Sequence, residues 1–127
     1  MKIKRFDHIV ISVTNLTKAV NFYHEVFDLP VLEELSTADR KVMRCGHQLL
    51  YLQQLDALSE LTPKTPTSGS ADLCLVASDP LENILNHLKS YFIEIIAGPK
   101  EAVGANGKMH VIYLNDPDGN LIELAVY

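Results

Sequence analysis

Three residues of types that bind divalent metal ions, His8, Asp72 and Glu123, lie in three separate strand-like segments of the chain. Side chains alternate between the two faces of a strand, so residue parity sorts each segment into two sets. In each segment one set is apolar and the other carries an ionisable group. An imidazole and two carboxylates converging from three strands suit Fe(II), Mn, Ni or Zn and leave coordination positions open for substrate or water. The pattern therefore predicts a metal site.

Each of these residues also has a simpler interpretation. A histidine in a strand is more often a hydrogen-bonded core or surface residue than a metal ligand. Glu123 is harder to explain in this way, because a carboxylate buried in an apolar terminal strand needs a cation or hydrogen-bond donors nearby. Tyr51 and Gln53 have the same parity as each other and are expected on the same face as His8.

Further candidates for a substrate pocket come from two other strands. In the segment Met109–Tyr113, parity places His110 with Ile112, or Met109 with Val111 and Tyr113, and the sequence does not choose between them. Arg44 could bind an anionic group of a substrate, although a charged residue facing outward from a half-buried strand is the simpler interpretation.

The elements that would position these residues follow one order twice. In the first half, the strand 7–13 precedes a helix from Leu16 to Phe27, which Asn15 caps and Pro30 ends, and the strands 31–35, 41–45 and 49–55 follow. In the second half, the strand 71–77 precedes a helix that begins near Pro80, and the strands 93–97, 109–114 and 121–127 follow. The order is β-α-β-β-β in both halves, so we expect an internal repeat.

The repeat predicts a single α+β domain over residues 1–127, with modules 5–55 and 71–127 joined by a linker over 56–70. The two modules would form one cupped mixed, mainly antiparallel sheet, with the helices on its outer face. The linker is long for a compact domain, which suggests a functional segment or a crossover. The glycine-containing segment 98–108 lacks a nucleotide-binding motif and is interpreted as a loop that could act as a lid.

Two sequence runs resemble a known family. The segments FDHIVISVTNLTKAVNFYHEVFDLPVL and YLNDPDGNLIELAVY are similar to the opening and closing motifs of the vicinal oxygen chelate (glyoxalase/bleomycin-resistance/extradiol-dioxygenase) superfamily. The run GSADLCLVASDPLENILNHL also resembles glyoxalase-domain-containing proteins that are sometimes labelled virulence proteins or dioxygenase-related. The resemblance covers nearly the whole chain and includes the duplicated order of elements.

The resemblance implies metal ligands on four strands. The histidine ligand on the family's first strand corresponds to His8, and the glutamate ligand on its last strand corresponds to Glu123. The ligand on the first strand of the family's second module, typically a histidine, corresponds to Asp72. The remaining ligand position corresponds to Tyr51, with Gln53 two residues further on. This departure weakens the case for glyoxalase I activity, whose acid–base step uses a displaceable carboxylate at the metal.

We therefore expect a metalloenzyme, lactoylglutathione lyase-like or dioxygenase-like, that acts on a small oxygenated substrate chelated by Fe, Mn, Ni or Zn. Lyase, ring-cleaving and thiol-transfer chemistry all stay open, with Glu123 as the candidate catalytic residue. The alternative is a metal-free, ligand-sequestering resistance-type protein that uses the same cup. A stress protein that uses only the fold is a third interpretation. Superfamily members of this size commonly dimerise, which implies a homodimer.

Composition limits the other function classes. The chain has 127 residues with 47% hydrophobic and 21% charged residues, which is ordinary for a folded domain. A net charge of −5 argues against nucleic-acid and anionic-membrane partners. No apolar run is long enough to cross a bilayer, and the basic start does not continue as a signal peptide. Cys45 and Cys74 are expected to be reduced and buried, as in a cytoplasmic protein.

Overall fold

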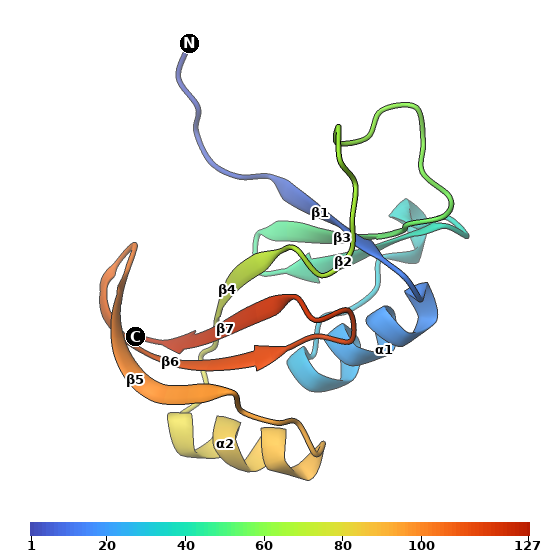
Figure 1. The fold of residues 1–127 in the computed structure, drawn as a ribbon. Coiled ribbons are helices and arrows are strands. Elements are labelled where there is room, and N and C mark those ends of the chain that lie inside the picture. The colour runs from blue at the N-terminus through green and yellow to red at the C-terminus, as the bar shows by residue number, and fades with distance from the viewer. The chain divides into compact units, whose positions relative to one another are not determined.

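The computed structural model describes residues 1–127, which divide into two compact units, Met1–Gly69 and Ser70–Tyr127. Each unit places one long helix after its first strand and further strands after that helix (Figure 1). The predicted α+β class with two β-α-β-β-β modules is therefore confirmed, with one change in each module described below. The prediction that the two modules make a single domain stays a prediction.

Unit 1 contains a three-stranded sheet and one helix. The sheet has the order β1-β3-β2, in which β1 runs parallel to β3 and β2 runs antiparallel to it. The elements are β1 (His8–Val13), α1 (Leu16–Phe27), the 3-10 helix η1 (Glu33–Leu35), β2 (Arg40–Cys45) and β3 (Gln48–Gln54).

Helix α1 begins and ends as the sequence predicts. The side chain of Asn15 accepts a hydrogen bond from the Lys18 backbone N–H at 2.9 Å, and this satisfies one of the donors that a helix start leaves unpaired. Asp28 adopts a left-handed conformation that ends the helix two residues before Pro30. The apolar side chains of α1 and of one sheet face form the buried core of the unit: Ile11, Val13, Ala19, Tyr23, Val26, Met43, Leu50 and Leu52.

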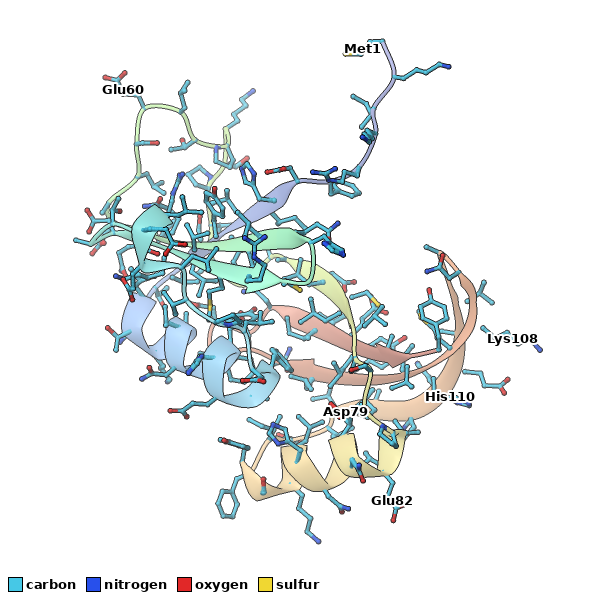
Figure 2. All side chains as sticks on the ribbon, turned by 180° about the vertical axis from the view of Figure 1, so that it is seen from behind. Met1, Glu60, Asp79, Glu82, Lys108 and His110 are labelled. Carbon is cyan, nitrogen blue, oxygen red and sulfur yellow. The ribbon has the colours of Figure 1, made fainter.

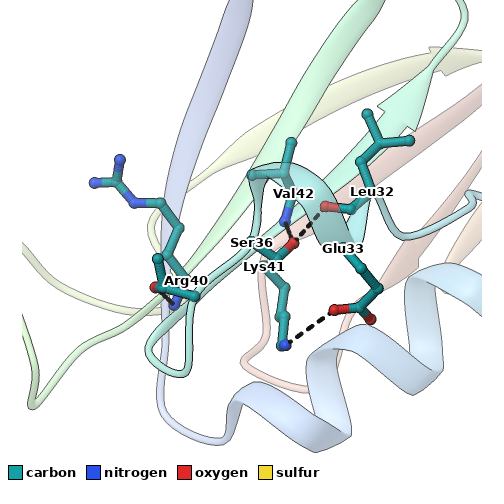
Figure 3. Close-up of polar contacts among 7 residues, drawn as sticks. Leu32, Glu33, Ser36, Arg40, Lys41 and Val42 are labelled. Atoms are coloured by element: carbon teal, nitrogen blue, oxygen red, sulfur yellow. Dashed lines mark hydrogen bonds and ion pairs between the residues drawn. The ribbon is translucent and has the colours of Figure 1, made fainter.

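The strand predicted over 31–35 is wrong, because only Val31 forms a bridge, to Met43. The hydroxyl of Ser36 accepts from the Val42 backbone N–H at 3.0 Å and donates to the Leu32 carbonyl at 2.8 Å (Figure 3). Ser36 thus occupies the β2 donor that a neighbouring strand would have used, and the chain turns into η1 instead. The Lys41–Glu33 ion pair, at 3.5 Å, links β2 to this turn.

Unit 2 contains a four-stranded sheet with the order β4-β7-β6-β5 and the helix α2. Strands β4 and β7 are parallel, while β7–β6 and β6–β5 are antiparallel. The elements are β4 (Asp72–Val76), α2 (Leu81–Ser90), β5 (Ala97–Gly104), β6 (Gly107–Asn115) and β7 (Leu121–Val126). Alternate residues of the central strands, together with two residues of α2, form the buried core: Ile84, Leu88, Ile112, Leu114, Ile122 and Leu124.

The predictions of a strand over 93–97 and a lid loop over 98–108 are wrong. Strand β5 covers Ala97–Gly104 and pairs with β6 through a tight turn at Ala105 and Asn106. The pair Asn106–Gly107 is a strong hairpin signal, and Gly107 adopts φ 115°, which favours glycine. Three glycines suggested a loop, but two of them, Gly104 and Gly107, flank a hairpin turn.

Residues 56–70, predicted as a linker, form turns and bends without a helix or strand. Neither α1 nor α2 has the length and apolar character needed to cross a lipid bilayer.

Candidate functional site

One face of the unit 2 sheet gathers four polar side chains, which we call the carboxyl face: Asp72, Cys74, Tyr113 and Glu123. The strand register explains the grouping, because Glu123 of β7 lies opposite Cys74 of β4 on one side and Tyr113 of β6 on the other. Asp72 lies two residues before Cys74, so its side chain has the same orientation. Lys100 of β5 places its ammonium group 4.7 Å from the centre of the Tyr113 ring.

The two carboxyl groups of this face are close enough to share a hydrogen bond. That bond to Asp72 is the largest of the effects that raise the pKa of Glu123, followed by partial burial and the negative charge of Asp72. A hydrogen bond from Tyr113 and the charge of Lys100 act in the opposite direction. Burial and the neighbouring Glu123 raise the pKa of the Tyr113 hydroxyl. The pKa of Glu123 is therefore raised mainly by its neighbour across the β4–β7 pair.

A buried turn fixes the position of Asp72 relative to Glu123. Asp116 is 5% exposed and its carboxylate accepts hydrogen bonds from the backbone N–H groups of Asp118 and Asn120 at 3.0 and 2.9 Å. Asn120 is 1% exposed and its side-chain oxygen accepts from the Ala71 backbone N–H at 2.9 Å. The DPDGN turn therefore anchors the start of β4 directly beside the start of β7.

One face of the unit 1 sheet carries basic and aromatic side chains, which we call the imidazole face: His8, Arg40, Arg44, Tyr51 and Gln53. These residues come from all three strands and share one face by register. The rings of His8 and Tyr51 are stacked, with centroids 4.4 Å apart and an angle of 17° between their planes. Tyr51 thus supports the imidazole from β3.

Asp7 determines which nitrogen of His8 is available. The Nδ1 atom of His8 lies 2.9 Å from Oδ2 of Asp7. This hydrogen bond, with smaller contributions from the charges of His8 and Arg5, lowers the pKa of Asp7. Because an ionised carboxylate only accepts, Nδ1 donates the proton of this hydrogen bond, and Nε2 is the ring nitrogen that Asp7 does not use. The same arrangement orients metal-binding histidines in proteins.

Gln53, predicted as a metal or pocket residue, uses its side chain to hold the protein together. It is 6% exposed, and its Nε2 atom donates to the carbonyls of Ala57 and Asp39 at 3.0 and 3.2 Å. Its oxygen accepts from Nε of Arg40 at 2.7 Å. The amide is therefore engaged at both ends, which leaves Tyr51 as the accessible member of the pair.

The two candidate pocket residues of β6, His110 and Tyr113, lie on opposite faces of the sheet. His110 shares its face with Ile112 and Leu114, whereas Tyr113 shares the opposite face with Val111. His110, visible beside the hairpin in Figure 2, therefore lies on the other side of the sheet from Glu123. This answers the question that parity left open and removes His110 from the carboxyl face. Arg44 is exposed on the imidazole face.

Sequence reasoning missed three residues and misjudged one. Asp7, Arg40 and Lys100 contact predicted site residues, yet all three have the pattern of ordinary surface charges in the sequence. Only Arg40 could have been found from the sequence, because it has the same parity as the predicted residue Arg44 in β2 and so lies on the same face. Cys74 was expected to be buried, but it is exposed on the carboxyl face, where burial of part of its thiol and the charges of Glu123 and Asp72 raise its pKa.

Within either unit, no three histidine, cysteine, aspartate or glutamate side chains gather closely enough to hold a metal ion. The donors that are present have suitable chemistry, since unit 2 offers two neighbouring carboxyl groups and unit 1 offers an imidazole with a free Nε2. Oxygen and imidazole ligands of this kind suit first-row divalent ions.

Comparison with known proteins identifies the class of protein. Residues 5–124 match the model of the Glyoxalase/Bleomycin resistance protein/Dioxygenase superfamily. The chain belongs to this superfamily, as the resemblance of its first and last segments predicted. Members of this superfamily include metal-dependent enzymes and proteins that bind small molecules.

The chain is similar to several individual members of the superfamily. The chain is 37% identical to virulence protein STM3117 of Salmonella typhimurium, over 100% of this chain and 87% of that protein. A crystal structure of STM3117 superposes with a TM-score of 0.93, covering 100% of this chain and 99% of that one. A glyoxalase domain-containing protein of Mycosarcoma maydis, RDO1, is 33% identical over 100% of this chain and 70% of its own. Metallothiol transferase FosB of Shouchella clausii is 29% identical over 93% of this chain and 77% of its own.

Proposed function

We propose that the protein is a metal-dependent enzyme that acts on a small oxygenated substrate. The metal ligands in this proposal are His8, Asp72 and Glu123. The ion is Fe, Mn, Ni or Zn, which imidazole and carboxylate ligands accept in common. Superfamily membership supports the class of reaction, and the donor chemistry of these three residues supports the ligand set.

The hydrogen-bonded pair of Asp72 and Glu123 is the observation that carries the proposal. Two carboxyl groups close enough to share a proton are also close enough to share a divalent cation, which would replace that proton. Both side chains keep contact with solvent, so an ion can enter. A pair that served only packing would be buried and fully hydrogen bonded.

His8 supplies the nitrogen ligand in this proposal through Nε2. Asp7 and Tyr51 hold its ring in one orientation, so binding an ion would cost little rearrangement of the imidazole. The proposal requires His8 of one unit to meet the carboxyl pair of another, in the same chain or in a second copy. A homodimer is also part of the proposal, because members of the superfamily often form dimers. A cytoplasmic location is proposed as well, since both thiols are free.

Glu123 is also the proposed catalytic residue. A divalent ion bound there would polarise two oxygens of the substrate and favour loss of a proton or attack by a nucleophile. Glu123 would accept such a proton only if its carboxylate could leave the ion, so the catalytic role requires a displaceable ligand. Tyr113, which hydrogen bonds Glu123, would hold the carboxylate in position while it accepts a proton.

The names of the family and of the relatives are compatible with three types of reaction: glyoxalase, dioxygenase and thiol-transfer chemistry. The family name covers glyoxalases and dioxygenases, and the related FosB is named a metallothiol transferase. Tyr51 stands where the superfamily pattern implies a further ligand, and a tyrosine cannot act there as a displaceable carboxylate. We therefore favour ring-cleaving or thiol-transfer chemistry over glyoxalase I chemistry.

Metal binding by purified variants tests the proposal. Calorimetric titration of chelator-treated protein with Mn²⁺, Ni²⁺ and Zn²⁺ should give one saturable site per chain, which His8→Ala and Glu123→Gln each lose. His110→Ala and Glu101→Gln are the matched controls, because both are exposed strand residues of the same types away from the proposed site. Loss of binding in the controls, or no saturable binding at all, contradicts the proposal. Chelator-insensitive binding of small organic ligands would instead favour a metal-free sequestering protein.

A further inference from the structure

The side chain of Arg40 is held by a hydrogen bond and by contact with an aromatic ring. Its Nε atom donates to the buried side-chain oxygen of Gln53 at 2.7 Å, and its backbone N–H donates to the hydroxyl of Thr37 at 3.2 Å. The central carbon of the guanidinium lies 5.5 Å from the centre of the Tyr51 ring. A cation over an aromatic face is stabilised by the ring, and the flat guanidinium loses little entropy when it is fixed there.

Gln53 can present only its oxygen to Arg40. The amide nitrogen donates to the carbonyls of Asp39 and Ala57, so a flipped amide would lose both of these bonds and would face Nε with a second donor. A buried amide with one possible orientation thus determines where the guanidinium points. Figure 3 shows Arg40 and the next residue, Lys41, extending in different directions from β2, with only Lys41 paired to an acidic residue.

The terminal nitrogens of Arg40 are left for a ligand. Within unit 1 none of the ion pairs involves Arg40, and the only hydrogen bond of its guanidinium uses Nε. The residue is partly exposed. Two parallel N–H groups on a fixed guanidinium fit two oxygens of a carboxylate, phosphate or phosphonate. Tyr51 contacts both Arg40 and the proposed metal ligand His8, so the guanidinium lies on the same sheet face as the imidazole.

We infer that Arg40, oriented by Gln53, is a binding residue for an oxyanion group of the substrate. The substrate class is then a small molecule that carries a carboxylate, phosphate or phosphonate beside its metal-binding oxygens. The inference rests on the proposed function for the metal-binding part of that substrate. Arg44, the residue that the sequence suggested for this role, is exposed, and no side chain holds it in one orientation.

Titration with simple anions tests the inference without knowledge of the substrate. Phosphate, methylphosphonate and acetate are added separately to the chelator-treated full chain, and the side-chain Nε–H signals of its arginines are followed by NMR. The Arg40 signal is assigned by its disappearance in Arg40→Lys. We expect a saturable shift of that signal with at least one anion, and the three arms distinguish a phosphoryl from a carboxylate ligand.

Variants give the size of the effect. Arg40→Gln should weaken binding of the effective anion by about tenfold or more, because a charge-assisted bidentate contact is lost. Arg40→Lys keeps the charge but loses the fork geometry and the bond to Gln53, so we expect an intermediate loss. Lys41→Gln is the matched control, since it removes one positive charge from the adjacent residue and should leave binding within about twofold.

Three results would overturn the inference: an Arg40 signal that no anion shifts, a shift that does not saturate, and equal weakening in Arg40→Gln and Lys41→Gln. The wild-type signal decides the matter alone if Arg40→Gln fails to fold. Failure here differs from failure of the proposed function, because anion binding is measured without metal and metal binding is measured without anion. A protein that binds metal but shows no response at Arg40 keeps the proposed function and loses the anionic substrate class.

Discussion

The two units share one order of elements but carry opposite chemistry on corresponding faces. The imidazole face of unit 1 has a histidine and two arginines, while the carboxyl face of unit 2 has two acidic groups and a tyrosine. His8 and Asp72 begin equivalent strands, β1 and β4, so the same position of the module carries an imidazole in unit 1 and a carboxyl group in unit 2. The two units therefore present different kinds of donor, an imidazole in unit 1 and two carboxyl groups in unit 2.

The supports of the two faces also differ. In unit 1 a carboxylate and an aromatic ring fix the imidazole, and a buried amide fixes a guanidinium. In unit 2 the acidic pair depends on a buried turn that aligns β4 with β7. The polar groups that do the positioning, Gln53, Asp116 and Asn120, are more deeply buried than the groups they position.

Core truncation should produce the largest effects and tests whether the units form one domain. Leu52→Ala in unit 1 and Leu114→Ala in unit 2 each remove a side chain with no exposed surface, so each should lower the free energy of unfolding by about 2–5 kcal/mol. If the prediction of a single domain holds, both variants shift the same single urea transition, followed by circular dichroism. Two separate transitions, each sensitive to one variant, would contradict it.

Removal of the partner of His8 should weaken metal binding without removing a ligand. Asp7→Ala frees Nδ1 from its carboxylate, and loss of such a contact typically costs about 10- to 100-fold in metal affinity. Competition with a chromogenic zinc chelator measures the change. Asp79→Ala, which removes an exposed aspartate from unit 2, is the control and should bind as the wild type does. Equal affinity in both variants would show that Asp7 does not orient the imidazole.

The helix starts differ between the units, and the difference predicts an effect of about 1 kcal/mol. Asn15 caps α1 with its side chain, whereas Pro80 at the start of α2 provides no such bond. Asn15→Ala should therefore lower the free energy of unfolding by about 1 kcal/mol. Pro80→Ser should raise the free energy of unfolding by less than about 1 kcal/mol, because the gain from the new cap is partly offset by the greater flexibility of the unfolded chain. Urea unfolding measures both, and an unchanged midpoint for Asn15→Ala would contradict the prediction.

The two faces should respond to pH in opposite directions, with the smallest effects of the series. The pKa of Glu123 is raised above its ordinary 4.5, so the folded state keeps a proton that the unfolded state has lost. The free energy of unfolding of chelator-treated protein should then fall as pH rises above about 4.5. Asp7, whose pKa lies below its ordinary 3.8, instead stabilises the fold above that pH and loses this effect as pH falls.

Unfolding curves between about pH 3 and pH 8 separate these contributions. Glu123→Gln should remove the decline on the basic side, and Asp7→Asn should reduce the loss on the acidic side. Glu101→Gln, at an exposed position of β5, should follow the wild-type curve throughout. If the free energy of unfolding of Glu123→Gln still falls at basic pH as it does in the wild type, another group causes that fall.

Local signals predicted much of the fold. The helices, the strands at the start of each unit and the last two strands of each unit follow hydrophobic periodicity, caps and turn residues, which act over a few neighbours. The errors arose where hydrogen bonds between neighbouring segments, rather than periodicity within one segment, decided the outcome. Ser36 binds Val42 across a turn and prevents a strand over 31–35, and pairing with β6 makes a strand of the glycine-containing segment after Ala97.

The chain's own order of residues determined the duplicated module, the parity of His8, Asp72 and Glu123, and the family to which the protein belongs. Tertiary structure alone decided that Tyr113, rather than His110, lies on the same sheet face as Glu123. It also decided that the Gln53 amide is fully hydrogen bonded within the protein and that the Arg40 guanidinium lies over the Tyr51 ring. The physical reason is range. Periodicity reports which side of a strand a residue occupies, whereas register between strands and the burial of an amide depend on partners that are distant in the chain.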